Sequence, residues 1–260
     1  MIPLSDDNPT VRPAVMTLLI LAAIAAVWLI VEGAGFGDRL VRAVCTLGMV
    51  PGELTGLAPL GFALPIAPGL ECAVDDQPIN WLTPLLSMFL HGGWEHLIGN
   101  AIFLWVFGNN IEDVMGAPRF AAFYVLCGLA AAAAHVMAGP ASPIPTVGAS
   151  GAISGVMGAY FVLFPRVRVR MLFIFVVFFR VIPLPAWMVL LWWLALQVLI
   201  GLPQLAGVGD LAGGVAVWAH VGGFVAGALL IRTFVRRDLV DERRAMLLHR
   251  GLLSESSGLR

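Results

Sequence analysis

Long stretches of this chain carry no charged side chain, and that feature constrains the possible folds more than any other. Of the 260 residues, 60% are hydrophobic and only 12% are charged. A soluble domain averages about 25% charged residues, so a globular protein with a polar shell is excluded, and so is a disordered chain. The apolar stretches are long enough to cross a bilayer as helices. The sequence therefore predicts an all-α, polytopic membrane protein.

We expect six transmembrane helices, separated by charged residues, prolines and glycines. The expected spans are 13–31, 94–111, 120–138, 150–164, 185–200 and 215–231. Residues 1–12 contain two aspartates and one arginine rather than a basic leader. We therefore expect the first span to be retained instead of cleaved as a signal peptide.

The segments between and after the spans have their own character. Residues 32–90 are interrupted by glycine, proline and acidic residues, and we expect a long external loop that lies against the membrane surface. The apolar run 171–181 contains Arg180, which favours a segment dipping into the membrane interface. Residues 236–260 are rich in charge and are expected to form a helical, solvated tail.

The arginines orient the helices. With the N-terminus in the cytoplasm, 13 of the 15 arginines fall in cytoplasmic segments, and only Arg39 and Arg42 lie outside. The positive-inside rule favours this placement, and an even number of spans then puts both termini in the cytoplasm. With no targeting signature evident, the expected location is a cell (inner) membrane. A net charge of −1 with no concentrated basic face argues against a nucleic-acid partner.

The three cysteines show no metal-binding spacing. Cys127 falls inside an apolar run, whereas Cys45 and Cys72 both lie in the long loop. An oxidising compartment would allow Cys45 and Cys72 to pair, but the sequence leaves this pairing open.

Polar side chains recur at one depth in three of the expected spans. Ser150 lies 16 residues before the nearest cytoplasmic arginine, which is about 24 Å of helix. His220 lies 12 residues before Arg232, the nearest cytoplasmic arginine on its span, which is about 18 Å of helix. In a hydrocarbon core of about 30 Å both groups, and His96 at a similar distance, belong to the outer part. Because polar groups inside a membrane are costly, we predict one water-filled cavity that serves all of them.

Small residues beside these groups indicate which helices meet. Gly151 adjoins Ser150, and His220 shares a stripe with Gly223 and Gly227. Such stripes let membrane helices approach closely, which would bring the Ser150 hydroxyl to the His220 imidazole. A serine needs a base to become a nucleophile, and histidine is the usual one.

His96 and Asn100 are four residues apart and share one helix face. Together with the Ser150 amide they are candidate hydrogen-bond donors for an oxyanion. No acidic residue lies at this depth near His220, so we expect a Ser–His dyad without an orienting carboxylate.

Each of these features has a plainer interpretation. A lone glycine–serine string is more often a site of helix packing, His135 has no partner motif and is interpreted as structural, and tryptophans such as Trp193 are typical of interface anchors. A transporter would show internal repeats and ionisable groups near mid-membrane, and we find neither. The joint occurrence at matched depth favours an enzyme.

At these positions the chain resembles the rhomboid family of intramembrane serine proteases. The matching blocks are HGGWEHLIGN at 91–100, GASGA at 148–152 and AHVGG at 219–223, in the family's order. The resemblance covers about residues 13–235 and implies a six-helix rhomboid bundle whose L1 loop is about 32–90. It implies that Ser150 is the nucleophile and His220 the general base, with His96, Asn100 and the Ser150 amide as the oxyanion hole.

The resemblance carries further implications. Gly148 would leave space around the site, and the remaining motif positions are His91, Gly151, Glu112, Gly223 and Gly227. Substrates would be single-pass transmembrane proteins in the lipid bilayer, and neither a metal nor another cofactor is implied. Ser154 departs from the pattern, because some members carry an aromatic residue there that stacks on the catalytic histidine. The alternative is a weak or inactive rhomboid-like protein that binds transmembrane helices, although this chain retains both dyad residues.

Overall fold

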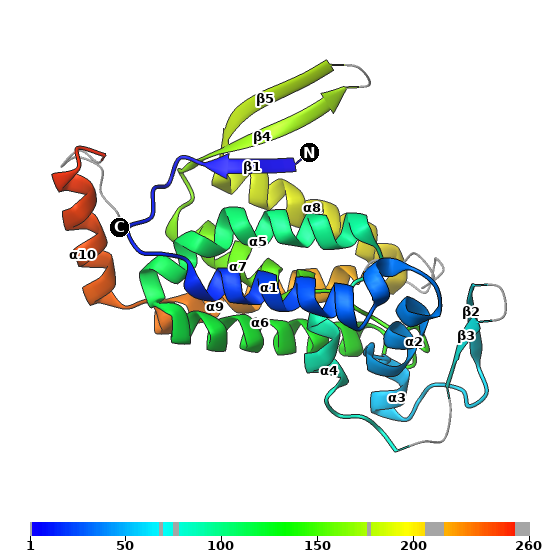
Figure 1. Ribbon diagram of the computed structural model, residues 1–260. Coiled ribbons are helices and arrows are strands. Elements are labelled where there is room, and N and C mark those ends of the chain that lie inside the picture. Colours follow the sequence, from blue (N-terminus) through cyan, green and yellow to red (C-terminus); the bar gives the residue numbers. More distant parts are fainter. Residues whose placement is uncertain (1, 68–69, 75–77, 176–177, 206–215, 253–260) are drawn as a thin grey trace.

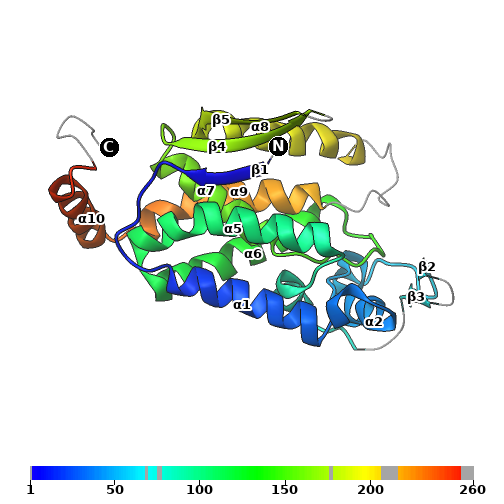
Figure 2. The ribbon, with the colours of Figure 1, turned by 45° about the horizontal axis from the view of Figure 1, so that its top comes forward.

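A computed structural model of the chain describes residues 2–67, 70–74, 78–175, 178–205 and 216–252. Its helices are α1 (Val15–Ile30), α2 (Asp38–Leu47), α3 (Pro51–Thr55), α4 (Thr83–Leu86), α5 (Trp94–Met115), α6 (Ala117–Ala138), α7 (Ser150–Leu163), α8 (Ala186–Leu205), α9 (Val217–Phe234) and α10 (Arg237–His249). The long helices α1 and α5 to α9 lie side by side along one axis (Figure 1, Figure 2), and α9 packs against both α6 and α7.

The long helices fall into three groups by length and polarity. Helices α6, α8 (over Ala186–Pro203) and α9 are long and apolar enough to cross a membrane, whereas α1 and α7 are equally apolar but have 16 and 14 residues. Helix α5 has 22 residues and carries polar side chains toward both of its ends. The chain is thus a mostly helical membrane protein, and the six-span count stays a prediction.

Glu112 explains how α1 begins. Its carboxylate accepts hydrogen bonds from the backbone N–H groups of Met16 (2.7 Å) and Thr17 (2.8 Å) and from the Thr17 hydroxyl (2.7 Å). These donors belong to the first turn of α1, where free N–H groups and the helix dipole favour an anion. Gly116, at φ 80°, then lets the chain reverse into α6, which has Pro118 in its first turn.

Two small sheets add strands to the helical bundle. The strands are β1 (Ile2–Asp6), β2 (Ala63–Ala67), β3 (Leu70–Ala73), β4 (Arg168–Phe175) and β5 (Phe178–Pro185). β2 and β3 form an antiparallel hairpin, and β4 pairs antiparallel with both β1 and β5. The run 171–181 was expected as an interfacial segment of an all-helical chain. Its described residues instead belong to β4 (171–175) and β5 (178–181).

An alternation along β4 explains this difference from the all-α expectation. Val169 and Met171 are buried against the helices, whereas Arg168 and Arg170 are exposed. A repeat of two residues is the pattern of a strand with one covered face, and its partner β1 lies far away in the sequence.

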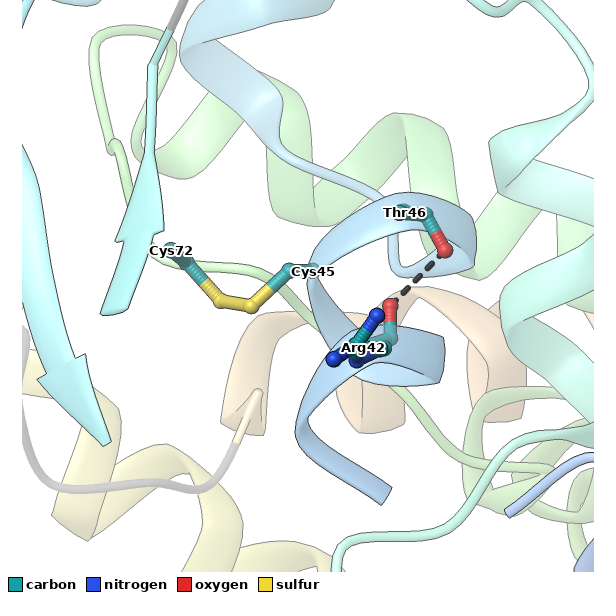
Figure 3. Close-up of a disulfide and its surroundings, with 4 residues drawn as sticks. All are labelled: Arg42, Cys45, Thr46 and Cys72. Atoms are coloured by element: carbon teal, nitrogen blue, oxygen red, sulfur yellow. Dashed lines mark hydrogen bonds between the residues drawn. A yellow bond between two sulfur atoms is a disulfide. The ribbon is translucent and has the colours of Figure 1, made fainter. Parts of the chain in front are cut away.

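The segment between α1 and α5 is fastened by a disulfide whose existence the sequence left open. Cys45 in α2 is bonded to Cys72 in β3 (Figure 3), closing a loop across 27 positions. Helices α2 and α3 and the β2–β3 hairpin lie together at one end of the bundle (Figure 1). Met49 pairs with Thr146 in an isolated antiparallel bridge, which ties this segment to the loop before α7.

The opposite end is fastened by the C-terminal helix, which is not simply solvated as expected. Arg243 of α10 is 2% exposed, and its Nε donates to the Asp113 carboxylate at 2.9 Å. The same carboxylate accepts from the backbone N–H groups of Val11 and Arg12, both at 3.1 Å. Asp113 therefore joins the N-terminal segment, the end of α5 and the C-terminal helix.

Removing this carboxylate leaves the buried Arg243 guanidinium without its ion-pair partner. We predict that Asp113→Ala lowers the free energy of unfolding by about 3–5 kcal/mol, which corresponds to roughly 6–20 °C in the thermal midpoint measured in mild detergent. The matched control is Asp7→Ala, since the ion pair between Asp7 and Arg170 has side chains 40% and 57% exposed. Such a pair is worth about 0–1 kcal/mol. Equal shifts for both variants would contradict the role given to Asp113.

Candidate active site

Ser150 and His220 are brought into direct contact by α7 and α9. The Ser150 hydroxyl lies 2.7 Å from His220 Nε2, across 70 positions of sequence. Ser150 is the first residue of α7, and His220 lies in the first turn of α9. The hydroxyl is therefore within hydrogen-bond reach of a base, the arrangement that activates a serine.

Glycines allow the close approach that this contact needs. A Cβ atom at Gly223 would lie 2.0 Å from the Gly151 carbonyl oxygen, and one at Gly227 would lie 1.9 Å from that of Gly155. Helices α7 and α9 thus meet backbone to backbone at these points. Gly151, Gly223 and Gly227, singled out in the sequence, all lie in this contact.

The second ring nitrogen of His220 has a partner that the sequence analysis missed. Gln197 of α8 places its Oε1 2.8 Å from His220 Nδ1. The sequence could have pointed to Gln197, since it is the one glutamine in the apolar stretch 186–203. Trp193, interpreted as an interface anchor, instead lies with its ring centroid 5.6 Å from that of His220.

Ser154, noted above as a departure from the resembled pattern, makes its hydrogen bond within its own helix. Its hydroxyl donates to the Ser150 carbonyl oxygen at 2.6 Å, one turn back along α7. The aromatic neighbour of His220 therefore comes from α8 instead of α7.

His96 and Asn100 line the same cavity as the serine and the histidine. This cavity has a volume of about 770 Å³ and is bordered by α5, α7, α8 and α9. The backbone N–H of Gly92 lies 3.4 Å from His96 Nδ1 and points its hydrogen at it, so in the neutral ring Nε2 carries the proton. A Cβ atom at Gly148, where φ is 132°, would lie 2.7 Å from His96 Nε2, so a glycine there leaves room for the ring.

Asn100 is held from behind by His91. The Asn100 amide nitrogen lies 2.9 Å from His91 Nε2, and the His91 backbone N–H donates to Glu32 Oε1 at 2.8 Å. Burial, and to a smaller degree the neighbouring His96, lowers the pKa of His91 to about 4. His91 is therefore neutral at pH 7, and its Nε2 can accept from Asn100, whose second amide hydrogen stays available to the cavity.

The remaining residues singled out in the sequence lie outside this cavity. Glu112 is at the opposite end of the bundle, where it caps α1. The Nε2 atom of His135 lies 2.9 Å from the Thr146 hydroxyl oxygen, which fits the structural role expected of His135. Among the described residues, no group of three or more histidine, cysteine or acidic side chains is arranged to hold a metal ion.

Comparisons with known proteins agree with the resemblance noted in the sequence. A family model described as the Rhomboid domain matches residues 77–237, well over half of the chain. The chain is 38% identical over 80 residues to the rhomboid protease GluP of Bacillus subtilis, covering 31% of this chain and 15% of that protein. It is 33% identical over 90 residues to RHOMBOID-like protein 5 of Arabidopsis thaliana, covering 35% and 29% of the two chains. It is 34% identical over 93 residues to the mitochondrial Rhomboid protein 1 of Saccharomyces cerevisiae, covering 34% and 27%. The matched stretch thus spans less than a third of each of these relatives.

A methyl group placed between α7 and α9 has no room. We predict that Gly227→Ala lowers the free energy of unfolding by about 3 kcal/mol, or roughly 6–12 °C in the thermal midpoint. The matched control is Gly99→Ala on α5, where an added Cβ meets nothing within 4 Å. Alanine is the better helix former, so this control should lose no stability. A Gly227→Ala protein as stable as the control would show that the two backbones are not in contact.

The buried carboxyl of Glu32 makes stability depend on pH. Burial raises the pKa of Glu32 from 4.5 to about 7, and no described residue donates to its Oε2. The raised pKa means that the folded state keeps a proton which the unfolded state releases. Its contribution to stability is complete below about pH 4.5 and is lost as the pH rises through about 7.

Glu32→Gln keeps the acceptor for His91 and removes the titration. We predict that wild type loses on the order of 1–3 kcal/mol relative to this variant between pH 4 and pH 8, or roughly 2–12 °C in the thermal midpoint. His91 titrates in both proteins, so its effect cancels in the comparison. A difference between the two midpoints that does not change with pH would mean that Glu32 does not titrate in this range.

Proposed function

Because the chain belongs to the rhomboid family, we propose that it is an intramembrane serine endopeptidase that cleaves single-pass transmembrane substrates. The observation that carries this proposal is the 2.7 Å contact between the Ser150 hydroxyl and His220 Nε2 at the edge of a cavity. Rhomboid proteins act on transmembrane substrates inside the membrane. A local alignment to GluP at 38% identity supports the family, and the geometry of the site supports the chemistry.

The proposed reaction proceeds through an acyl-enzyme. His220 Nε2 takes the hydroxyl proton as Ser150 Oγ bonds to the scissile carbonyl carbon, giving a tetrahedral intermediate. The protonated imidazole then gives that proton to the leaving amine as the C–N bond breaks. A water molecule, deprotonated by His220, hydrolyses the resulting ester and frees Ser150.

The negative charge of the intermediate needs donors fixed in advance. We propose that His96 Nε2–H, the free amide hydrogen of Asn100 and the Ser150 backbone N–H supply them. In comparable sites one such donor is worth about 2.7–4 kcal/mol in the transition state. Hydrogen bonds to Gly92 and His91 support this assignment, because they set which ring or amide atoms face the cavity.

The proposed topology has six spans, α1 and α5 to α9, with both termini in the cytoplasm of a cell (inner) membrane. The excess of arginines on that side supports this orientation. So does the disulfide between Cys45 and Cys72, because disulfides persist in oxidising compartments and this one lies at the end of the bundle away from α10. The rhomboid domain would occupy 13–235, preceded by residues 1–12 and followed by the tail 236–260.

The proposed route of entry lies between α5 and α8. A second, largely apolar cavity of about 510 Å³ adjoins α8, β4 and β5, and it shares Phe103 and Trp193 with the first. These two side chains separate the cavities, so a small movement of α8 would join an apolar groove to the reactive serine.

The alternative function is that of an inactive family member that binds transmembrane helices without cutting them.

Labelling with a fluorophosphonate separates the two functions without a known substrate. We predict that the wild-type protein in detergent forms an adduct on Ser150, mapped by mass spectrometry. His220→Ala should slow labelling at least about a hundredfold, since a general base contributes about 10²–10⁴ in rate. The matched control is His135→Ala, which removes a histidine outside the cavity lining and should label at the wild-type rate.

A folded wild-type protein that forms no adduct on Ser150 would support the helix-binding alternative instead. An adduct that persists unchanged in His220→Ala would show that this histidine is not the base.

A further inference from the structure

Gln197 occupies the place that a carboxylate holds in other serine hydrolases. Its Oε1 lies 2.8 Å from His220 Nδ1, on the side of the imidazole ring away from Ser150. We propose that Gln197 is a positioning residue that holds the catalytic histidine in its reactive tautomer and orientation. This inference rests on the proposed protease function and extends it from a dyad to a Ser150–His220–Gln197 relay of hydrogen bonds.

The chemistry of the two partners determines the tautomer. A glutamine Oε1 can only accept, so His220 Nδ1 must carry the hydrogen of the neutral ring. Nε2 then has a free lone pair, and it faces the Ser150 hydroxyl, the proton of which it must take. Without the Oε1 acceptor the ring can protonate on Nε2 instead, which leaves no base in front of the serine.

A neutral amide suits this place better than a carboxylate. Gln197 is half-buried in α8, within a stretch apolar enough to cross a membrane. A charged side chain at such a depth would cost about 2.5–3.5 kcal/mol or more, whereas an amide accepts the same hydrogen bond without a net charge. The absence of an acid near His220, noted in the sequence, is therefore compatible with an oriented histidine.

Helix α8 holds His220 through two side chains on one face. Trp193 and Gln197 are four residues apart, so they project in the same direction. The Trp193 ring lies 5.6 Å from the His220 ring at an interplanar angle of 42°, and it also stacks on Phe224 of α9 at 6.4 Å. The orientation of the base thus depends on how α8 sits against α9.

The start of α8 is anchored independently of the site. The backbone N–H groups of Ala186 and Trp187 donate to the carbonyls of Val167 (2.8 Å) and Pro165 (2.9 Å), in the turn that follows α7. These hydrogen bonds fix the start of α8 relative to α7, the helix that carries the nucleophile. The position of Gln197 along α8 is therefore also fixed relative to α7.

The test compares Gln197→Leu, which has nearly the same size but no acceptor, with Gln197→Glu, which restores one. The matched control is Leu199→Ala, since Leu199 is 63% exposed two positions further along α8. We measure the rate of fluorophosphonate labelling at Ser150, and kcat and KM for a reconstituted transmembrane substrate. The removal of the partner that orients a metal-bound histidine typically costs about 10–100-fold, and we adopt that range here.

The expected result is a 10–100-fold slower labelling of Gln197→Leu, with an equal fall in kcat and with KM within about twofold of wild type. Gln197→Glu should recover most of that loss, and Leu199→Ala should stay within twofold. Labelling of Gln197→Leu at the wild-type rate would overturn the proposal. So would an equal loss in Gln197→Leu and Leu199→Ala, which would indicate packing alone.

A nuclear magnetic resonance measurement keeps this test separate from the protease proposal. In ¹⁵N-histidine-labelled protein, the His220 signals, assigned with His220→Ala, report which nitrogen carries the proton. The Nδ1–H form in wild type and its loss in Gln197→Leu support the role of Gln197 even if Ser150 is not labelled at all. Identical ring signals in both proteins overturn it.

Discussion

The direct backbone contact between α7 and α9 is the constraint on which the rest of the site depends. Inside a bilayer the burial of apolar surface gives helices no reason to associate, because lipid tails are as apolar as leucine. Close packing must hold them together instead, and Gly227 lies so near the Gly155 carbonyl that a single methyl group at Gly227 has no room. That contact sets the distance between the first turns of the helices, where Ser150 and His220 meet.

The two ends of the bundle are fastened by different interactions. Neither set includes the side chains of the cavity, which are oriented by their own hydrogen bonds. One end has a disulfide and the bridge between Met49 and Thr146. The other has a buried ion pair between Asp113 and Arg243, and the Glu112 carboxylate at the start of α1. Between them the histidines and amides of the cavity each have a partner that sets their direction.

Much of this arrangement follows from local sequence. The span expected at 13–31 is α1 at Val15–Ile30, and the one at 150–164 is α7 at Ser150–Leu163. Charges, prolines and glycines mark such boundaries within a few residues. The family was also predictable, since three separate motifs agree in order and spacing, and the match over 77–237 confirms it.

The features that sequence reasoning missed all depend on partners distant in the chain. β4 alternates like a strand, but its partner β1 is the N-terminus, and Arg243 finds Asp113 across 130 positions. Gln197 was visible as a lone polar residue in an apolar span. Its partner depends on which face α8 turns toward α9, and no local sequence pattern specifies that orientation. For the same reason the sequence left the pairing of Cys45 with Cys72 open.

The most direct test of the account is to map the cut in a substrate inside a bilayer. The purified protein and a single-pass protein with small residues in its outer third are reconstituted into vesicles, and both fragments are identified by mass spectrometry. We predict one cut, in the outer part of the substrate's span, that disappears in Ser150→Ala. A cut that persists in Ser150→Ala, or that lies in the cytoplasmic half of the span, would contradict it.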